Sequence, residues 1–211
     1  MNIKKNGLIS KVKEGKIVLI KTVSEEQKAY QKSFIYKIKE ENEIFKAENG
    51  RQRLANTETY GCQQNENDTE RIRGILAECG FGFTERAEDA DVVIYNTCAV
   101  RENAEQKVFG RIGILKHIKE SRPELIIGLC GCMVQQEHIT DKILETHRHI
   151  DLLFGPHALF KLPELLYNAM HQKKTVVDIE DCDGYIAEDI PIMRESKDKA
   201  WVSVMYGIRR T

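Results

Sequence analysis

Short, uniformly apolar segments alternate with amphipathic segments from about residue 55 onward. The apolar segments lack the alternation of a half-exposed strand, which is typical of strands buried on both faces of a parallel sheet. The strands predicted in this way are 55–60, 91–95, 125–129, 152–154 and 175–179. The segments between them carry apolar residues at helical spacing, as at Ile72, Ile75, Leu76 and Cys79. The predicted helices are 68–79, 100–120, 134–146 and 157–171.

Strands that alternate with helices predict an α/β fold, a doubly wound and mostly parallel sheet with helices on both faces, as in flavodoxin-like and Rossmann-like proteins. Residues 55–180 form this domain. Residues 1–54 are predicted to be a charged, partly helical extension, with a helix over 24–48 that ends at Asn49-Gly50. Residues 181–211 begin with an acidic run and contain Pro191, which indicates a linker that leads toward another domain.

The 211 residues have the composition of a globular protein, with 41% hydrophobic and 31% charged residues. No apolar run approaches the roughly 18 residues of a membrane helix, and no signal peptide is evident. We therefore expect a cytoplasmic monomer without a membrane partner. Residues 1–55 carry 13 Lys and Arg against 7 Asp and Glu. This basic arm either contacts RNA phosphates or is a solvated extension.

Three cysteines occupy the same kind of position, directly after a predicted strand and before a helix: Cys62, Cys98 and Cys132. Because the carboxyl ends of parallel strands lie along one edge of a sheet, the three thiols can converge there. A helix N-terminus favours the thiolate over the thiol, and thiolates are soft ligands for iron–sulfur clusters or zinc. Gly61 and Gly131 permit tight turns and close backbone approach beside them.

The other cysteines have different predicted roles. Cys79 lies on an apolar helix face and is predicted to be a core residue. Cys130 lies in a strand and is either a core residue or a rival ligand, and Cys182 lies free in the linker. Three thiolates leave one iron of a cubane cluster without a protein ligand, whereas a structural zinc site wants four ligands. The count therefore favours a cluster that faces a substrate.

Several polar side chains accompany the cysteines. They either hydrogen-bond to sulfur or cap helices, and they are Gln63, Asn65, Asn67, Asn96, Thr97 and Asn103.

Three ordered motifs resemble signatures of the methylthiotransferase family: Thr59–Glu70 (TYGCQQNENDTE), Asn96–Ala104 (NTCAVRENA) and Gly131–Gln135 (GCMVQ). The first motif is similar to the tRNA-modifying branch, and the resemblance covers roughly residues 55–207. It implies a radical S-adenosylmethionine enzyme that adds a methylthio group to N6-isopentenyladenosine next to the anticodon of tRNA. Such enzymes carry two [4Fe–4S] clusters. By position, Cys62, Cys98 and Cys132 bind the auxiliary cluster, whose open iron presents the sulfur to be transferred.

The sequence departs from the family after Met205-Tyr-Gly207. The family continues there into a Cys-x₃-Cys-x₂-Cys loop that holds the S-adenosylmethionine cluster, whereas this chain reads Ile208-Arg-Arg-Thr211. We therefore expect the chain to supply the auxiliary-cluster domain, with no catalytic residue of its own assigned and the sulfur donor unknown. S-adenosylmethionine and the second cluster are expected only in the full-length family enzyme. Two alternatives remain: a non-catalytic zinc or iron–sulfur module, and an interaction domain with buried cysteines.

Overall fold

The computed structural model describes the backbone of residues 4–5, 8–13, 16–99, 102–179, 185–186, 190–194 and 201. It describes the side chains of residues 23–99, 105–179, 190–194 and 201. The predictions for Cys182, the side chain of Asn103 and residues 205–211 lie outside these described residues.

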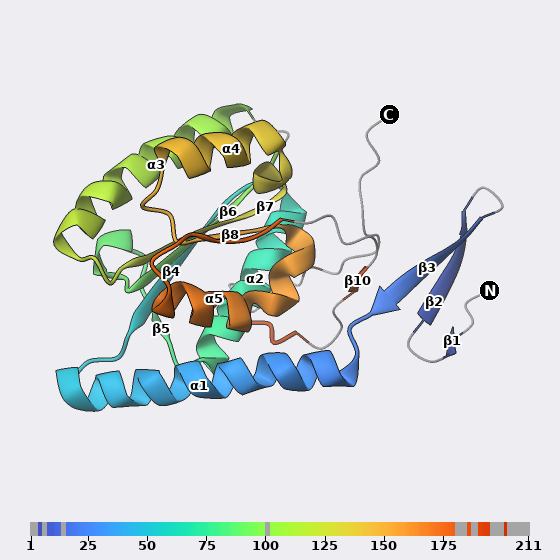
Figure 1. The fold of residues 1–211 in the computed structure, drawn as a ribbon, viewed down its shortest axis with the longest axis horizontal. Helices are drawn as coiled ribbons and strands as arrows, with labels where there is room; N and C mark the ends of the chain where they lie inside the picture. Colours follow the sequence, from blue (N-terminus) through green and yellow to red (C-terminus); the bar gives the residue numbers. More distant parts are fainter. Residues whose placement is uncertain are drawn as a thin grey trace.

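A six-stranded parallel sheet forms the centre of the molecule (Figure 1), and its strands lie in the order β5-β4-β6-β7-β8-β9. The strands are β4 (Leu54–Tyr60), β5 (Gly82–Phe83), β6 (Val92–Thr97), β7 (Ile126–Gly131), β8 (Leu152–Phe154) and β9 (Val176–Asp178). The chain runs from β4 to the edge strand β5, and then returns past β4 to build the rest of the sheet. The order reverses between β4 and β6, as in flavodoxin-like proteins, and the predicted fold class is confirmed.

Helices cover both faces of this sheet (Figure 1). One face carries α2 (Gln63–Glu78) and α5 (Leu162–His171), with α1 (Glu25–Asn49) lying across them, and the other carries α3 (Glu102–Ser121) and α4 (Glu137–Thr146). The described residues also form the short 3₁₀ helices η1 (Ala87–Asp89), η2 (Cys132–Gln135) and η3 (Pro156–Lys161).

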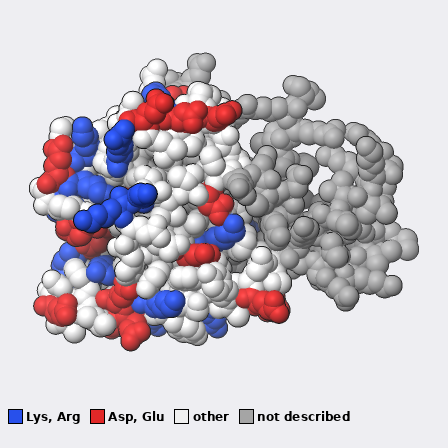
Figure 2. All heavy atoms as spheres, in the orientation of Figure 1, with Lys and Arg blue, Asp and Glu red and all other residues white. Residues whose placement is uncertain are grey.

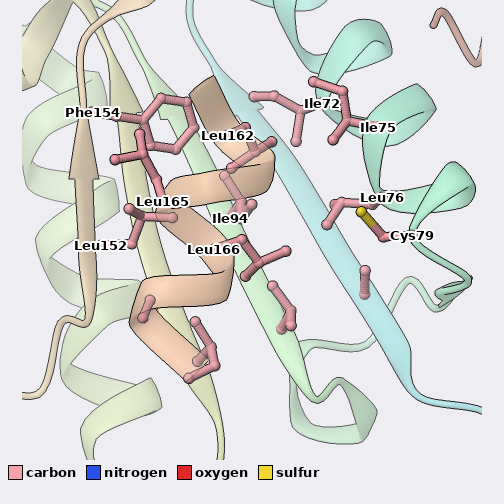
Figure 3. Close-up of a cluster of buried hydrophobic side chains, with 14 of the residues drawn as sticks. Ile72, Ile75, Leu76, Cys79, Ile94, Leu152, Phe154, Leu162, Leu165 and Leu166 are labelled. Carbon is pink, nitrogen blue, oxygen red and sulfur yellow. The ribbon is translucent and has the colours of Figure 1, made fainter. Parts of the chain in front are cut away.

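Two apolar cores result from this layering. Ile94 of β6 packs with α2 and α5 (Figure 3), whereas its neighbours Val93 and Tyr95 belong to the core beneath α3 and α4. Successive strand residues point to opposite faces, so a strand covered on both faces is apolar at every position. This explains the uniformly apolar segments of the sequence.

Helix α1 follows the prediction at both ends. Ser24 and Gln27 form a capping box at its start, and Gly50 ends it in a left-handed conformation at φ 67°. Its buried Ile38 belongs to the core that α2 and α5 cover, and Asn42 donates a hydrogen bond to the Cys79 carbonyl. The helix is therefore packed onto the α/β layers. The division of the chain at residues 54 and 180 stays a prediction.

A second sheet was not predicted from the sequence. Its backbone order is β1-β2-β3-β10, with β1 (Lys4–Lys5), β2 (Leu8–Lys13), β3 (Lys16–Thr22) and β10 (Tyr185–Ile186). β2 and β3 pair antiparallel, and β10 pairs parallel with β3. The pairing joins segments from both ends of the sequence, and a reading of local patterns does not detect such a contact.

Three predicted helix starts were wrong. The first helix of the α/β domain begins at Gln63 and not at residue 68, because Cys62 and Asn65 form a capping box ahead of the apolar stripe. The α-helices α4 and α5 begin later than predicted, at Glu137 and Leu162, because the 3₁₀ helices η2 and η3 precede them. Apolar periodicity does not distinguish a 3₁₀ turn from the first turn of an α-helix.

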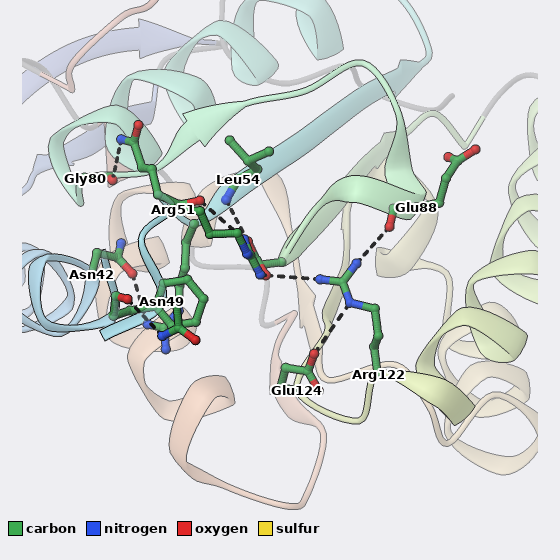
Figure 4. A network of polar contacts seen from close by, with 12 residues as sticks. Asn42, Asn49, Arg51, Leu54, Gly80, Glu88, Arg122 and Glu124 are labelled. Atoms are coloured by element: carbon green, nitrogen blue, oxygen red, sulfur yellow. Dashed lines mark hydrogen bonds and ion pairs between the residues drawn. The ribbon is translucent and has the colours of Figure 1, made fainter. Parts of the chain in front are cut away.

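A buried carboxylate ties the amino edge of the sheet together (Figure 4). Asp91 accepts two hydrogen bonds from Arg51, both at 2.8 Å, and one from Arg122 at 3.1 Å. It also accepts the Leu54 N–H at 2.8 Å. Burial alone would raise the pKa of Asp91, but the bonds from Arg51 and Leu54 and the charges of both arginines lower it overall. Of the polar residues before β4, Arg51 serves this network, whereas Gln52 donates to the Gly80 carbonyl and Arg53 to Asn42.

Acidic and basic side chains are interleaved on the face of the molecule in Figure 2. Within the part of the chain that the structure describes, no helix is both long enough and apolar enough to span a membrane.

Candidate functional site

Register brings the three predicted cysteines to one edge of the sheet. Tyr60 pairs with Thr97, and Thr97 pairs with Gly131, so the carboxyl ends of β4, β6 and β7 are level. The cysteines follow these positions within one or two residues, and they are Cys62, Cys98 and Cys132. The Cys98 N–H donates to the Tyr60 carbonyl at 3.0 Å, which continues the pairing past the end of β6. The edge includes the β4–β6 switch point, where ligands of such sheets bind.

The three cysteines differ in their relation to helices. Cys62 is the N-cap of α2, and Cys132 is the first residue of the 3₁₀ helix η2. Cys98 lies in the segment between β6 and α3. None of the five cysteines that the structure describes forms a disulfide. All three sulfurs are therefore free thiols at neighbouring strand ends.

A helix start was expected to favour the thiolate form of each of these cysteines, but at Cys132 burial outweighs that effect. Burial raises the pKa of its thiol to about 11, and the neighbouring Cys98 and Cys62 raise it further, while a backbone hydrogen bond opposes the shift. Cys98 and Cys62 therefore lie close enough to Cys132 to disfavour a negative charge on its sulfur. Within the residues described, no three His, Cys, Asp or Glu side chains stand in a ready-made metal-binding arrangement. A metal ion would therefore have to bring the three thiols together and displace the protons from their sulfurs.

Gly131 makes the close approach beside Cys132 possible. Its φ is +96°, and a Cβ at this position would lie 2.4 Å from the Thr97 carbonyl oxygen. A Cβ on Gly61 would likewise lie 2.5 Å from Asn65 Oδ1. The prediction of close approach is confirmed, because a side chain on Gly131 would collide with the end of β6 and one on Gly61 would collide with Asn65 of α2.

Of the polar residues at this edge, Asn65 has both predicted roles, whereas Asn96 and Thr97 have neither. Asn65 has both, because its Oδ1 accepts the Cys62 N–H and lies 3.2 Å from Cys62 Sγ. Asn96 has neither role and bonds to Asn65 and Thr69 instead. The Thr97 hydroxyl donates to the Cys130 carbonyl at 2.9 Å. Asn96 therefore links β6 to α2, and Thr97 links β6 to β7.

Cys79 and Cys130 are core residues. Both side chains are buried in the core beneath α2 and α5. Burial raises the pKa of Cys79 to about 12 and raises that of Cys130 as well. The prediction that Cys79 is a core residue is confirmed, and Cys130 is buried in the same core.

One residue of this region was missed from the sequence. Asp68 of α2 is buried, accepts a hydrogen bond from Gln64 at 3.0 Å, and has its pKa raised by burial to about 6. Its charge contributes to the raised pKa values of Cys130 and Cys132. Its place on the inward stripe of the helix, four residues before Ile72, was the available signal.

A protein-family model matches the central part of the chain. Residues 55–155 match the family model described as "Uncharacterized protein family UPF0004". This range begins within β4, ends just after β8 and contains all three cysteine motifs.

Relatives named "tRNA-2-methylthio-N(6)-dimethylallyladenosine synthase" are similar to most of the chain. The protein from Acetivibrio thermocellus is 51% identical over 185 residues, which cover 88% of this chain and 38% of that protein. The protein from Clostridioides difficile is 41% identical over 186 residues, covering 88% and 39%. That from Halalkalibacterium halodurans is 50% identical over 149 residues, covering 71% and 28%. The resemblance to tRNA methylthiotransferases is confirmed: the chain is a relative of the N-terminal part of these synthases and spans less than two fifths of their length.

Proposed function

We propose that this chain supplies the auxiliary-cluster domain of a cytoplasmic tRNA methylthiotransferase. In this proposal Cys62, Cys98 and Cys132 hold a [4Fe–4S] cluster, and the reaction adds a methylthio group to N6-isopentenyladenosine of tRNA. The proposal rests on the similarity to the named synthases and on one structural observation. That observation is the common level of the three strand ends that precede the cysteines.

The donor set fits such a cluster. Thiolates are the ligands that iron–sulfur clusters use, and the three thiols are unpaired. With three protein ligands, the bound group would keep one iron open to an exogenous sulfur. The residues of the chain hold and orient the thiols: Gly131 admits close approach of β6 and β7, and α2 directs the backbone of its N-cap Cys62 toward the site.

The Cys-x₃-Cys-x₂-Cys loop of radical S-adenosylmethionine enzymes does not occur in these 211 residues. We therefore propose that this part of the chain does not cleave S-adenosylmethionine by itself, and that the second cluster is required for transfer. Detection of 5′-deoxyadenosine from the 211-residue protein under anaerobic conditions would contradict this.

A second function follows from the same thiols. A non-catalytic module would bind zinc through the three cysteines, with water or another group as the fourth ligand. The high pKa of Cys132 does not distinguish the two functions, because either metal has to displace the same proton.

The deciding experiment measures iron and acid-labile sulfide per chain after anaerobic reconstitution. The parent is compared with Cys62→Ala, Cys98→Ala and Cys132→Ala, and Cys79→Ala serves as the control that removes a buried thiol elsewhere. We expect equal amounts of iron and sulfide in the parent and the control, with a large loss in each of the other variants. Zinc without sulfide would favour the second function. Binding indifferent to all three substitutions would refute both functions.

A further inference from the structure

Two buried asparagines lie directly behind the cysteine edge. Asn65 of α2 is 2% exposed and Asn96 of β6 is 1% exposed. Their contact is reciprocal: Asn65 Nδ2 donates to Asn96 Oδ1 at 2.8 Å, and Asn96 Nδ2 donates to the Asn65 carbonyl at 2.8 Å. Because amide nitrogen only donates and amide oxygen only accepts, the pair fixes the orientation of both side chains.

The pair reaches Cys62 through the remaining oxygen of Asn65. This Oδ1 accepts the Cys62 backbone N–H and the Cys62 thiol, both at 3.2 Å. One atom therefore holds the backbone and the sulfur of the first cysteine. A rotation of the Asn65 amide would break both contacts and the bond to Asn96.

The pair also reaches the second cysteine. Asn65 Nδ2 donates a second hydrogen bond, at 3.3 Å, to the carbonyl of Thr97. That carbonyl belongs to the peptide group that leads into Cys98. The amide of Asn65 thus spans the backbone beside two of the three cysteines.

The third cysteine is reached through Gly131. A Cβ at Gly131 would lie 2.5 Å from Asn96 Oδ1 and 2.4 Å from the Thr97 carbonyl. The peptide that leads into Cys132 is therefore packed directly against the asparagine pair. Any shift of Asn96 toward β7 is blocked by this backbone.

The hydroxyl groups of Thr59 and Thr69 complete the network. Asn96 Nδ2 donates to Thr69 Oγ1 at 3.2 Å, and Thr59 Oγ1 donates to the same oxygen at 2.7 Å. Every polar atom of the two asparagine side chains consequently has a partner. Buried networks that are fully satisfied in this way make a region rigid.

We propose that Asn65 and Asn96 are positioning residues that set the spacing of Cys62, Cys98 and Cys132. The metal-related part of this inference rests on the proposed function, since it assumes that the three thiols act as a ligand set. The spacing itself is a property of the metal-free chain and is tested without a cluster.

The test uses inorganic arsenite on the reduced, metal-free protein. As(OH)₃ reacts with three thiols: each As–S bond replaces an As–O bond, and the thiol proton leaves with the hydroxide as water. Affinity is measured from the protection of the three cysteines against alkylation, which mass spectrometry assigns to each residue. The variants are Asn96→Leu and Asn65→Leu, which remove the amides at similar volume.

Asn42→Leu is the matched control. Asn42 is also buried and also donates to a carbonyl, that of Cys79, but it lies on α1 near the amino edge of the sheet. We expect the parent and Asn42→Leu to bind arsenite equally, and both edge variants to bind about tenfold more weakly, as is usual when partners of metal ligands are removed. If Asn96→Leu does not fold, Thr69→Val tests the same network with a loss in the same direction.

Equal affinity in all folded variants would overturn the inference, and so would a parent that does not protect the three thiols. Iron and sulfide loading of the same proteins separates this inference from the proposed function. Arsenite binding that depends on the asparagines in a parent that takes up no sulfide would support the positioning role and refute the cluster. Cluster loading of the parent with unchanged arsenite affinity in both variants would support the cluster and refute the positioning role.

Discussion

Gly74 of α2 lies directly against the backbone carbonyl of Pro191. A Cβ at Gly74 would lie 2.1 Å from the Pro191 oxygen, and one turn away the Met193 N–H donates to the Glu70 carbonyl at 2.9 Å. Residues 190–194 therefore cross the helix whose N-cap is Cys62. The segment after the α/β domain is fixed to the same helix that presents the first cysteine.

Because of this contact, we expect Gly74→Ala and Gly110→Ala to affect the protein differently, although both place alanine in a helix. Gly110→Ala in α3 has open space around the new Cβ and should stabilise the protein by up to about 1 kcal/mol, since alanine favours helices. Gly74→Ala brings the same helical gain but forces residues 190–194 off the helix. We expect the Met193 amide to lose its protection from hydrogen exchange in Gly74→Ala only. Unchanged protection at Met193 in that variant would show that the contact does not hold the segment.

The buried Asp68 predicts an unusual pH dependence. Burial raises its folded pKa to about 6 from an ordinary value of 3.8. The folded protein therefore binds a proton more tightly than the unfolded chain, and this contribution to stability is complete below pH 4 and is lost as the pH rises through 6.

Asp68→Asn keeps the shape and removes the charge. At pH 7.5 we expect it to raise the free energy of unfolding of the metal-free protein by up to roughly 3 kcal/mol, the equivalent of about two pKa units. The difference should vanish near pH 3.5 in urea titrations. Asp141→Asn, at an exposed position of α4, should change stability by less than about 0.5 kcal/mol at either pH. A destabilised Asp68→Asn at pH 7.5 would contradict the argument.

For Asp91 we expect the opposite pH dependence of stability. Its folded pKa lies below the ordinary value, so its contribution to stability is present above pH 4 and is lost as the pH falls through the folded pKa. Asp91→Ala leaves Arg51, Arg122 and the Leu54 N–H without their acceptor. We expect a cost of about 3 kcal/mol in urea unfolding at pH 7, which shrinks at pH 2–3.

The control for Asp91 is Asp89→Ala. Asp89 pairs with Arg86 at 3.3 Å on the surface, and exposed pairs contribute less than about 1 kcal/mol. Equal costs for the two substitutions would show that the network around Asp91 is no more than a surface ion pair.

The sequence by itself determined the α/β class, five of the six strands of the parallel sheet and the apolar stripes of the covering helices. These follow from local physics, because a strand covered on both faces is apolar throughout and a covering helix repeats its apolar residues every three or four positions. The core role of Cys79 was predicted for the same reason, and the end of α1 was predicted from the stop signal Asn49-Gly50. The strand ends before Cys62, Cys98 and Cys132 were placed on one edge by the rule for parallel sheets.

Only the tertiary structure decided what lies between residues that are distant in the chain. Three contacts each join different elements: the reciprocal Asn65–Asn96 contact, the donors that share the Asp91 carboxylate, and the packing of Pro191 against Gly74. A periodic pattern in the sequence indicates that a residue is buried, but it does not indicate which polar atom of another element that residue contacts. The pKa values of Asp68 and Cys132 depend on that same information, since burial and neighbouring charges set them.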